Sequence, residues 1–133
     1  MIKLIASDMD GTLLDEHSKV PPETFELIEA LCEKGVHFAV SSGRRYDRLC
    51  TFFEPVRDHM DFVASNGAQV YADGKLIDRE VYSHLAIREL ARVIEMFDNL
   101  HLALFDRTKS FLLDDESKFV REVDKDLPNA ERI

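Results

Sequence analysis

The stretch IASDMDGTLLD, residues 5–15, decides how the rest of the chain is interpreted. It places two carboxylates, Asp8 and Asp10, directly after the short apolar run Ile2–Ser7, which predicts a buried strand. Two carboxylates a few ångströms apart repel each other by roughly 4 kcal/mol at an effective dielectric constant of about 20, so a protein keeps such a pair where a cation or a shared proton offsets the repulsion. We therefore expect a functional site at the end of the first strand.

The residue types in this stretch favour a hard divalent cation. Oxygen ligands favour Mg²⁺, and no Cys or His lies nearby to favour zinc, so Asp8 and Asp10 are the predicted metal ligands. A carboxylate at a metal can also attack phosphorus and form an aspartyl phosphate, while a second carboxylate handles the leaving-group proton. Gly11 and Thr12 would offer backbone N–H groups to phosphate oxygens. An acidic turn without a ligand has the same spacing, so spacing alone leaves both interpretations open.

The segments that follow predict a Rossmann-like α/β fold. The sequence SKVPPETFELIEALCEKGV, residues 18–36, predicts a helix, and Val36–Ser41 predicts a second strand. Arg45–Phe53 is expected to be a helix ended by Pro55, and Asp61–Ala64 a third strand. A strand, helix, strand order with such short connections implies a parallel sheet with right-handed crossovers.

Polar side chains follow each of the three predicted strands. In open α/β sheets ligands bind at the carboxyl ends of the strands, so these clusters are expected to meet at one edge of the site. The clusters are Asp8 and Asp10 after the first strand, Ser41–Arg44 after the second, and Ser65–Gly67 after the third. Each of the last two is also compatible with an ordinary turn after a strand.

The second half of the chain has a different pattern and predicts a smaller α+β unit. The boundary is expected near Tyr82–Leu85, which divides the chain into residues 1–82 and 83–133. A hairpin is expected over residues 68–82, with Asp73-Gly74 as its turn. A helix is expected over Leu85–Asn99, and its apolar stripe of Leu90, Val93, Ile94 and Phe97 is expected to pack in a core. Strands are expected over 101–105 and 110–113, and a second helix from about Glu116.

Composition limits the kinds of partner and compartment. A net charge of −9 over 133 residues repels a phosphate backbone and anionic membranes, so we expect no nucleic-acid and no membrane partner. With neither an apolar span of membrane length nor a secretory leader in the sequence, a cytoplasmic protein is expected. Cys32 and Cys50 are expected to be buried or half-buried thiols, and the five histidines, which lack ligand spacing, to be structural.

Three sequence blocks together resemble a known family. DMDGTLLD matches the DxDGTLL(D) signature of the haloacid dehalogenase-like phosphohydrolases, and SSGR followed by SNGA is similar to the Cof-type branch of that family. The resemblance implies a HAD-like core, here partial, followed by the start of an α+β cap domain that covers the site and selects the substrate. It also implies a Mg²⁺-dependent phosphatase that acts on small phosphorylated metabolites such as sugar phosphates.

The resemblance implies a role for each residue of the three blocks. Asp8 would be the nucleophile and a metal ligand, and Asp10 would be the general acid and base and would bind the metal through its backbone carbonyl. Ser42 would hydrogen-bond the transferring phosphoryl group. The residues expected to line the phosphate or substrate side are Gly11, Thr12, Gly43, Arg44, Asn66 and Gly67, with Arg44 as a partner for a phosphate or sugar group.

The sequence departs from the family pattern in its second half. Neither the lysine that neutralises the phosphoryl charge nor the acidic GDxxND-type loop is identifiable, and Lys109, Lys118 and Lys125 lack the expected context. The sequence is thus expected to cover about the first half of such a protein. Without the missing groups its activity should be weak or absent. Its sheet should also have an open edge, which favours self-association. A phosphomutase of the same fold and a non-catalytic binding or assembly module are the alternatives. A receiver-type signalling domain fits the order of elements poorly, and no P-loop motif is present.

Overall fold

A computed structural model of the protein describes residues 1–106, 109–112 and 130–132. The chain divides into two compact units, Met1–Val81 and Tyr82–Ile133. The assignment of the two units as a catalytic core and the start of a cap stays a prediction.

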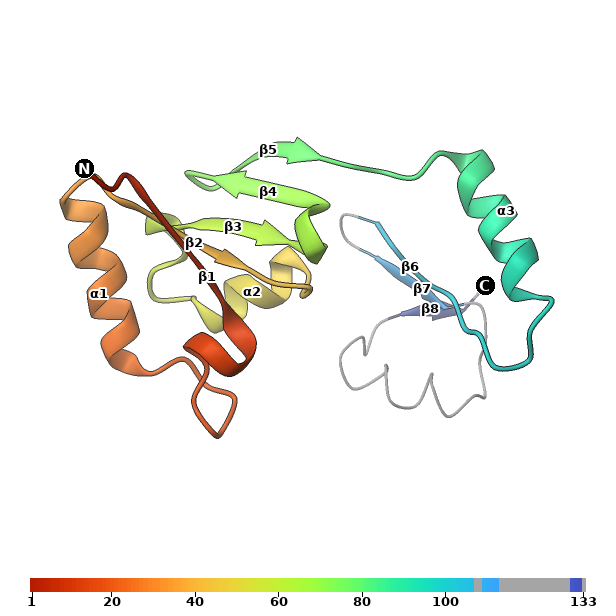
Figure 1. The fold of residues 1–133 in the computed structure, drawn as a ribbon, viewed down its shortest axis with the longest axis horizontal. Coiled ribbons are helices and arrows are strands. Elements are labelled where there is room, and N and C mark those ends of the chain that lie inside the picture. The colour runs from red at the N-terminus through yellow and green to blue at the C-terminus, as the bar shows by residue number, and fades with distance from the viewer. Residues whose placement is uncertain (107–108, 113–129, 133) are drawn as a thin grey trace. The chain divides into compact units, whose positions relative to one another are not determined.

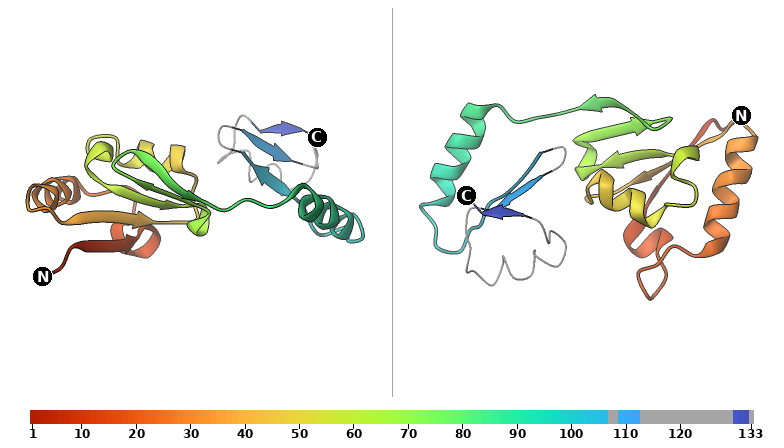
Figure 2. Two further views of the ribbon diagram at one scale, coloured as in Figure 1. Left: turned by 90° about the horizontal axis from the view of Figure 1, so that it is seen from above. Right: turned by 180° about the vertical axis from the view of Figure 1, so that it is seen from behind.

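The first unit is built on one five-stranded sheet. Its strands lie in the order β1-β2-β3-β4-β5, with β1 and β5 at the two margins (Figures 1 and 2). The strands are β1 (Leu4–Asp8), β2 (His37–Ser41), β3 (Asp61–Ala64), β4 (Gln69–Ala72) and β5 (Lys75–Arg79). Strands β1, β2 and β3 are parallel, and the β4–β5 hairpin adds to β3 in antiparallel sense. The predicted α/β fold is confirmed, with the refinement that the hairpin belongs to the same sheet.

The hairpin turn follows its sequence signal. Asp73 and Gly74 both have positive φ, 49° and 70°, as a type I′ turn requires. This turn gives the two strands a right-handed twist that matches the sheet.

Two helices connect the parallel strands. α1 (Pro22–Glu33) begins with Pro22 at its first position, where the missing N–H costs nothing. α2 (Tyr46–Phe52) follows β2, and the short helical turn η2 (Arg57–His59) precedes β3. The rings of Phe25 in α1 and Phe53 just after α2 meet edge to face with centroids 6.4 Å apart, so the two helices pack on the same side of the sheet.

The core of the first unit lies between these helices and one face of the sheet. Its buried members include Met9, Val20, Ile28, Phe38, Val40, Leu49, Phe53, Val56, Met60, Phe62 and Ala64. Because side chains alternate along a strand, Phe38, Val40 and Phe62 enter this core while their neighbours point to the other face. On β1, Leu4 is 56% exposed, since among the described strands only β2 flanks β1.

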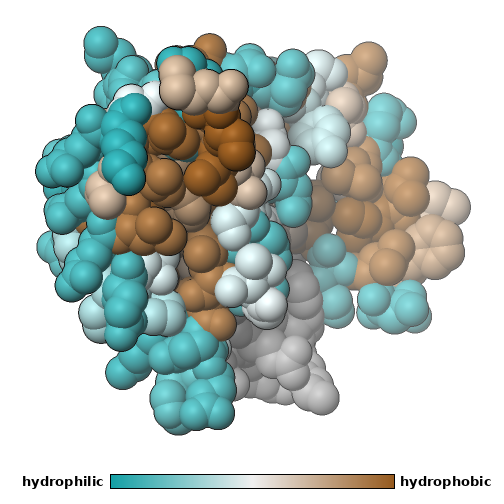
Figure 3. Space-filling model, turned by 60° about the vertical axis from the view of Figure 1, so that its left-hand side comes forward, coloured by the Kyte–Doolittle hydropathy of each residue, from teal (hydrophilic) through white to brown (hydrophobic). Residues whose placement is uncertain are grey.

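The margin of the sheet at β1 carries exposed apolar side chains. Among the described strands β1 pairs only with β2, and the large apolar residues exposed on β1, the segment before it and α1 are Met1, Ile2, Leu4 and Leu27. Figure 3 shows apolar surface with a hydrophilic border on the side of the molecule that comes forward in that view. The open edge predicted from the sequence is therefore present in the described part of the sheet.

The second unit contains α3 (His84–Ile94) and the three strands β6 (Ala103–Phe105), β7 (Ser110–Leu112) and β8 (Glu131–Arg132). Ser83 caps α3 by accepting a hydrogen bond from the Ala86 N–H at 3.1 Å. β6 and β7 are antiparallel, and β8 is parallel to β7. The α+β character is as predicted, but β8 was not predicted, because two residues carry too little pattern.

Three detailed expectations were wrong or lie outside the description. α3 ends at Ile94 instead of Asn99, and none of its residues is buried; Phe97, expected in a core, is 50% exposed. Within the described residues nothing covers this helix face closely enough to bury it. Cys32 is exposed near the C-terminal end of α1, although it follows the buried Ile28 by one helical turn, whereas Cys50 is half-buried as predicted. The helix predicted from Glu116 falls outside the described residues.

The boundaries of the other elements differ from prediction by a few residues at most. The first strand begins at Leu4 instead of Ile2 and extends to Asp8, and β3 has the predicted bounds Asp61–Ala64. In the described part of the chain, no helix has the length and apolar composition needed to cross a membrane.

Candidate active site

The acidic loop begins at the last residue of β1. Asp8 ends the strand, and the turn η1 (Met9–Leu13) follows at once, with non-helical backbone angles at Asp10 and Gly11. Met9 is 0% exposed and anchors the turn in the core, while Asp8 and Asp10 on either side of it are exposed. Gly11 has φ +76°, a conformation that costs a residue with a side chain about 1–2 kcal/mol. Burial of Met9 and the turn at Gly11 together keep both carboxylates at the surface.

Asp15 closes the loop that follows. Its carboxylate accepts hydrogen bonds from the backbone N–H groups of Lys19 at 2.8 Å and His17 at 2.9 Å. The bond from Lys19, helped by that from His17, holds the pKa of the Asp15 carboxyl below its ordinary value. The last acid of the DMDGTLLD stretch therefore has a structural role.

Ser42 lies at the end of β2, in the neighbouring loop. It is 8% exposed, and its backbone N–H donates to the carbonyl of Val63 in β3 at 3.0 Å. The Ser42 hydroxyl oxygen accepts a bond from the backbone N–H of Arg44 at 3.2 Å. A hydroxyl that accepts at its oxygen still has its own proton to donate.

The third block, in the turn η3 (Ser65–Gly67), is bonded directly to the second. The Asn66 N–H donates to the Ser42 carbonyl at 3.1 Å, and the Ser65 N–H donates to the Arg44 carbonyl at 2.9 Å. A Cβ atom placed on Gly43 would lie 3.0 Å from the side-chain oxygen of Asn66. Glycine at position 43 therefore lets the Asn66 amide lie against the backbone of the second loop.

Arg44 joins the second block to the first. Its Nη2 atom donates to Oδ1 of Asp10 at 2.8 Å, with the two side chains 31% and 60% exposed. The sequence interpretation paired Arg44 with a phosphate or sugar group and did not foresee this contact across 34 residues. Among the described residues no hydrogen bond or ion pair engages the Asp8 carboxylate, and Asp8 lies beside Ser41 in the strand register.

Comparison with known proteins agrees with this arrangement. Residues 5–132 match the family model described as haloacid dehalogenase-like hydrolase. The chain belongs to this family. The resemblance stated from the three sequence blocks is thereby confirmed, and the position of these blocks at neighbouring strand ends is the arrangement expected for a HAD-like core.

The relatives of this HAD-like chain are phosphatases by name. The 5-amino-6-(5-phospho-D-ribitylamino)uracil phosphatase YbjI of Escherichia coli is 40% identical over 75 residues, which are 56% of this chain and 28% of that protein. The enzyme of the same description from Bacillus subtilis, YcsE, is 31% identical over 81 residues, 60% of this chain and 32% of that one. The chain thus spans about a third or less of these relatives.

A solved structure shares the whole fold. The protein SMU.1108c of Streptococcus mutans superposes with a TM-score of 0.89 at 26% identity, over 100% of this chain and 51% of that one. The HAD-like chain therefore spans about half the length of this neighbour.

Within this HAD-like site, direct contacts link five of the predicted residues: Asp10, Ser42, Gly43, Arg44 and Asn66. Asp8 and Gly11 belong to the adjoining first loop, as does Thr12, which is exposed, and Gly67 ends η3. Their roles stay predictions.

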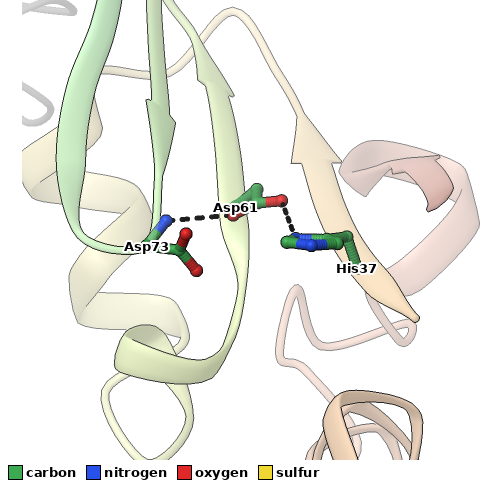
Figure 4. A group of neighbouring side chains, drawn as sticks. All are labelled: His37, Asp61 and Asp73. Atoms are coloured by element: carbon green, nitrogen blue, oxygen red, sulfur yellow. Dashed lines mark hydrogen bonds and ion pairs between the residues drawn. The ribbon is translucent and has the colours of Figure 1, made fainter. Parts of the chain in front are cut away.

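A second polar group lies at the opposite, amino end of the strands. His37 begins β2, Asp61 begins β3 and Asp73 lies in the hairpin turn (Figure 4). Asp61 pairs with the Nδ1 atom of His37 at 3.0 Å and accepts a bond from the Asp73 N–H at 3.2 Å. The ligand atoms of the three side chains lie within 4.8 Å of one another. Sequence spacing did not reveal this group, since its members are far apart in the chain.

Two further ionisable groups have pKa values displaced by their surroundings. Burial, with help from the Cys50 side chain, raises the pKa of Tyr46 to about 12; its ring stacks on Tyr71 with centroids 3.5 Å apart. In the second unit a hydrogen bond to Glu131 raises the pKa of Lys109. Lys109 thus has a structural partner, whereas Lys118 and Lys125 lie outside the described residues.

Proposed function

We propose that the protein to which this chain belongs is a Mg²⁺-dependent phosphatase that works through an aspartyl phosphate on Asp8. The observation that carries the proposal is the contrast between two neighbouring acids. Asp10 is held by Arg44, while the exposed carboxylate of Asp8 engages no partner among the described residues. A nucleophile needs such an unoccupied oxygen.

The first half-reaction transfers the phosphoryl group to Asp8. A carboxylate oxygen of Asp8 attacks phosphorus, an O–P bond forms, and the bond from phosphorus to the leaving-group oxygen breaks. The electron pair of that bond stays on the leaving-group oxygen, which takes a proton from the Asp10 carboxyl group. The Ser42 hydroxyl donates a hydrogen bond to a phosphoryl oxygen, while its oxygen accepts the bond from the backbone N–H of Arg44.

The second half-reaction releases phosphate. A water molecule attacks the phosphorus of the aspartyl phosphate and gives its proton to the Asp10 carboxylate. The O–P bond to Asp8 breaks, and its electron pair returns to the Asp8 carboxylate. Asp10 therefore acts first as an acid and then as a base, which requires its carboxyl group to stay aimed at one position.

The donor set suits Mg²⁺. The Asp8 carboxylate and the Asp10 backbone carbonyl are hard oxygen donors, and no His or Cys lies in this loop. These two residues would hold the ion, which would supply charge stabilisation for the phosphoryl oxygens. Gly11, Thr12, Gly43, Asn66 and Gly67 would line the phosphate or substrate side.

The substrate proposed is a small phosphomonoester with a sugar-like or polyol group. The relatives named above are described as phosphatases of a phosphoribitylamino compound, which supports this class. A cytoplasmic location is part of the same proposal. We propose further that residues 83–133 are the start of the cap domain that selects it.

The test is release of inorganic phosphate from a panel of sugar phosphates and phosphoribityl compounds, with and without Mg²⁺. It is run on the 133-residue chain and on a version extended by its genomic downstream sequence, each beside Asp8→Asn. We expect Mg²⁺-dependent turnover that Asp8→Asn abolishes. Turnover that survives Asp8→Asn contradicts the proposal.

The same assay separates the alternatives. Transfer of the phosphoryl group to a second sugar hydroxyl, with no release of phosphate, would identify a phosphomutase. Absence of both reactions in the extended protein would leave a binding or assembly module. Activity in the extended protein alone would show that the residues of this chain are insufficient.

We also propose that the open edge of β1 pairs with a second copy of the chain. The edge is flanked by the exposed apolar residues Ile2 and Leu4, 67% and 56% exposed. The measurement is the oligomeric state of the 133-residue chain by light scattering. Ile2→Lys with Leu4→Lys should shift a dimer to monomer, and a wild-type monomer at all concentrations would refute the pairing.

A further inference from the structure

Arg44 lies where the three sequence blocks of the site meet. Its side chain reaches from the loop after β2 to Oδ1 of Asp10, with a donor to acceptor distance of 2.8 Å. Its backbone carbonyl accepts the Ser65 N–H bond at 2.9 Å. One residue therefore connects the loops that follow β1, β2 and β3.

The guanidinium group is held in place by more than this ion pair. Its central carbon lies 5.3 Å from the centroid of the Phe52 ring, a cation–π distance. The backbone N–H of Arg44 is bonded to the buried Ser42 hydroxyl, which fixes the start of the side chain. The side chain is 31% exposed, so much of its rotamer freedom is already lost before any substrate binds.

The way Arg44 is held has a cost. Its Nε atom is buried and has no hydrogen-bond partner among the described residues. An unsatisfied buried donor destabilises the folded state, so its retention calls for an explanation. This side-chain conformation leaves Nε without a partner among the described residues, but it places Nη2 2.8 Å from Oδ1 of Asp10. We take the contact with Asp10 as the reason for the conformation.

We propose that Arg44 is the positioning residue for the acid–base carboxylate of Asp10. This inference rests on the function proposed above. The charge-assisted bond engages Oδ1, and so it fixes the direction of the second carboxylate oxygen, which transfers the proton in both half-reactions. A surface aspartate without such a partner would rotate freely about its side-chain bonds. Arg44 thus acts through Asp10 and not by contact with the substrate.

The experiment is a double-mutant cycle in the form of the protein that turns over substrate. Arg44→Met keeps an unbranched stem against Phe52 and removes the charge. We expect it to lower kcat by about tenfold to a hundredfold, because the Asp10 carboxyl group is no longer held in position. KM should change by less than about twofold, because Arg44 does not contact the substrate. Arg44→Lys should restore part of kcat. In an Asp10→Asn background Arg44→Met should have no further effect.

Arg45→Met is the matched control. Arg45 is the next residue, and its guanidinium bonds the carboxylate of Asp47 in α2. Its substitution removes the same charge from the same loop and should leave kcat within about twofold of wild type.

Two results would overturn the inference. An Arg44→Met effect that persists in the Asp10→Asn background, or that falls on KM, would assign Arg44 to substrate binding. The second test is independent of turnover and uses NMR of the 133-residue chain. The N–H protons of the Arg44 guanidinium should give separate signals in the wild type and a single averaged signal in Asp10→Asn. Signals unchanged by Asp10→Asn would refute the ion pair. Loss of the proposed function itself is recognised separately, by turnover that survives Asp8→Asn.

Discussion

The two ends of the β-sheet carry polar groups of similar composition that are arranged in opposite ways. At the amino end, Asp61 is 15% exposed and both of its oxygens are used, one by His37 and one by the Asp73 N–H. At the carboxyl end, Asp10 has one bond from Arg44, and Asp8 is exposed with no hydrogen bond or ion pair to its carboxylate among the described residues. A group that satisfies itself stabilises the fold, whereas a group left open is available to a ligand.

The difference follows from what each end must do. A carboxylate whose two oxygens each accept a hydrogen bond from the protein contributes to stability and is less available to a metal or to phosphorus than a carboxylate without such bonds. A carboxylate without hydrogen-bond partners contributes little to the stability of the fold. Beside another acid it is also repelled, and a bound cation can offset this repulsion. Substitutions at the two ends should therefore separate activity from stability.

Asp8→Ala gives the largest expected effect. It should reduce phosphatase turnover by on the order of 10⁴-fold or more, because it removes the proposed nucleophile, and should leave the midpoint of urea unfolding unchanged. Asp15→Ala in the same stretch is the control: it should retain turnover and lower the unfolding midpoint, since Asp15 closes its loop. An unfolding midpoint lowered more by Asp8→Ala than by Asp15→Ala would erase the contrast between the two acids.

Asp61→Ala tests the amino end. It should lower the free energy of unfolding by about 1–2 kcal/mol, because it leaves the Asp73 N–H and His37 without their partner, while turnover per folded molecule stays unchanged. Asp61→Asn is the matched variant, since its amide oxygen can still accept from the turn. Urea unfolding monitored by circular dichroism measures both. Loss of turnover at full folding would show that the two ends are coupled.

Gly43→Ala should sharpen the picture of the carboxyl end. Its Cβ atom would lie 3.0 Å from the Asn66 side-chain oxygen, so the amide must shift by a few tenths of an ångström. We expect turnover to fall by about threefold with little change in stability. Combined with Asn66→Ala, which removes the obstructing amide, Gly43→Ala should add no further loss. An equal loss in both backgrounds would mean that Gly43 acts on something other than Asn66.

The smallest effect is confined to alkaline pH. The folded-state pKa of Tyr46 is raised to about 12 from 10.0, so the folded state retains the phenol proton after the unfolded chain has lost it. The stability that Tyr46 contributes is complete below pH 10 and is lost as the pH rises toward about 12. Urea unfolding across this range should show a steeper decline in wild type than in Tyr46→Phe. Equal declines would mean that packing against Tyr71 of β4 does not bury the Tyr46 hydroxyl enough to raise its pKa.

Several elements of the fold could be predicted from local sequence signals. The apolar run before Asp8, the Asp73-Gly74 pair and the helix start at Pro22 are local signals, and each predicted its element to within a few residues. The length of α3 and the exposure of Phe97 and Cys32 were mispredicted, because a helical stripe says which residues share a face but not whether another element covers it.

For the site, the sequence alone determined which residues stand at the carboxyl ends of three parallel strands, because the position of each strand along the chain and the chemistry of each turn are set by local sequence. Only the tertiary structure decided how these residues divide their contacts: Arg44 holds Asp10, Asn66 packs on Gly43, and Asp61 joins His37 to the hairpin turn. The partners are separated by 12 to 34 residues, and no pattern in the chain encodes such pairs. Their geometry arises from strand register and packing, which form only when the sheet is assembled.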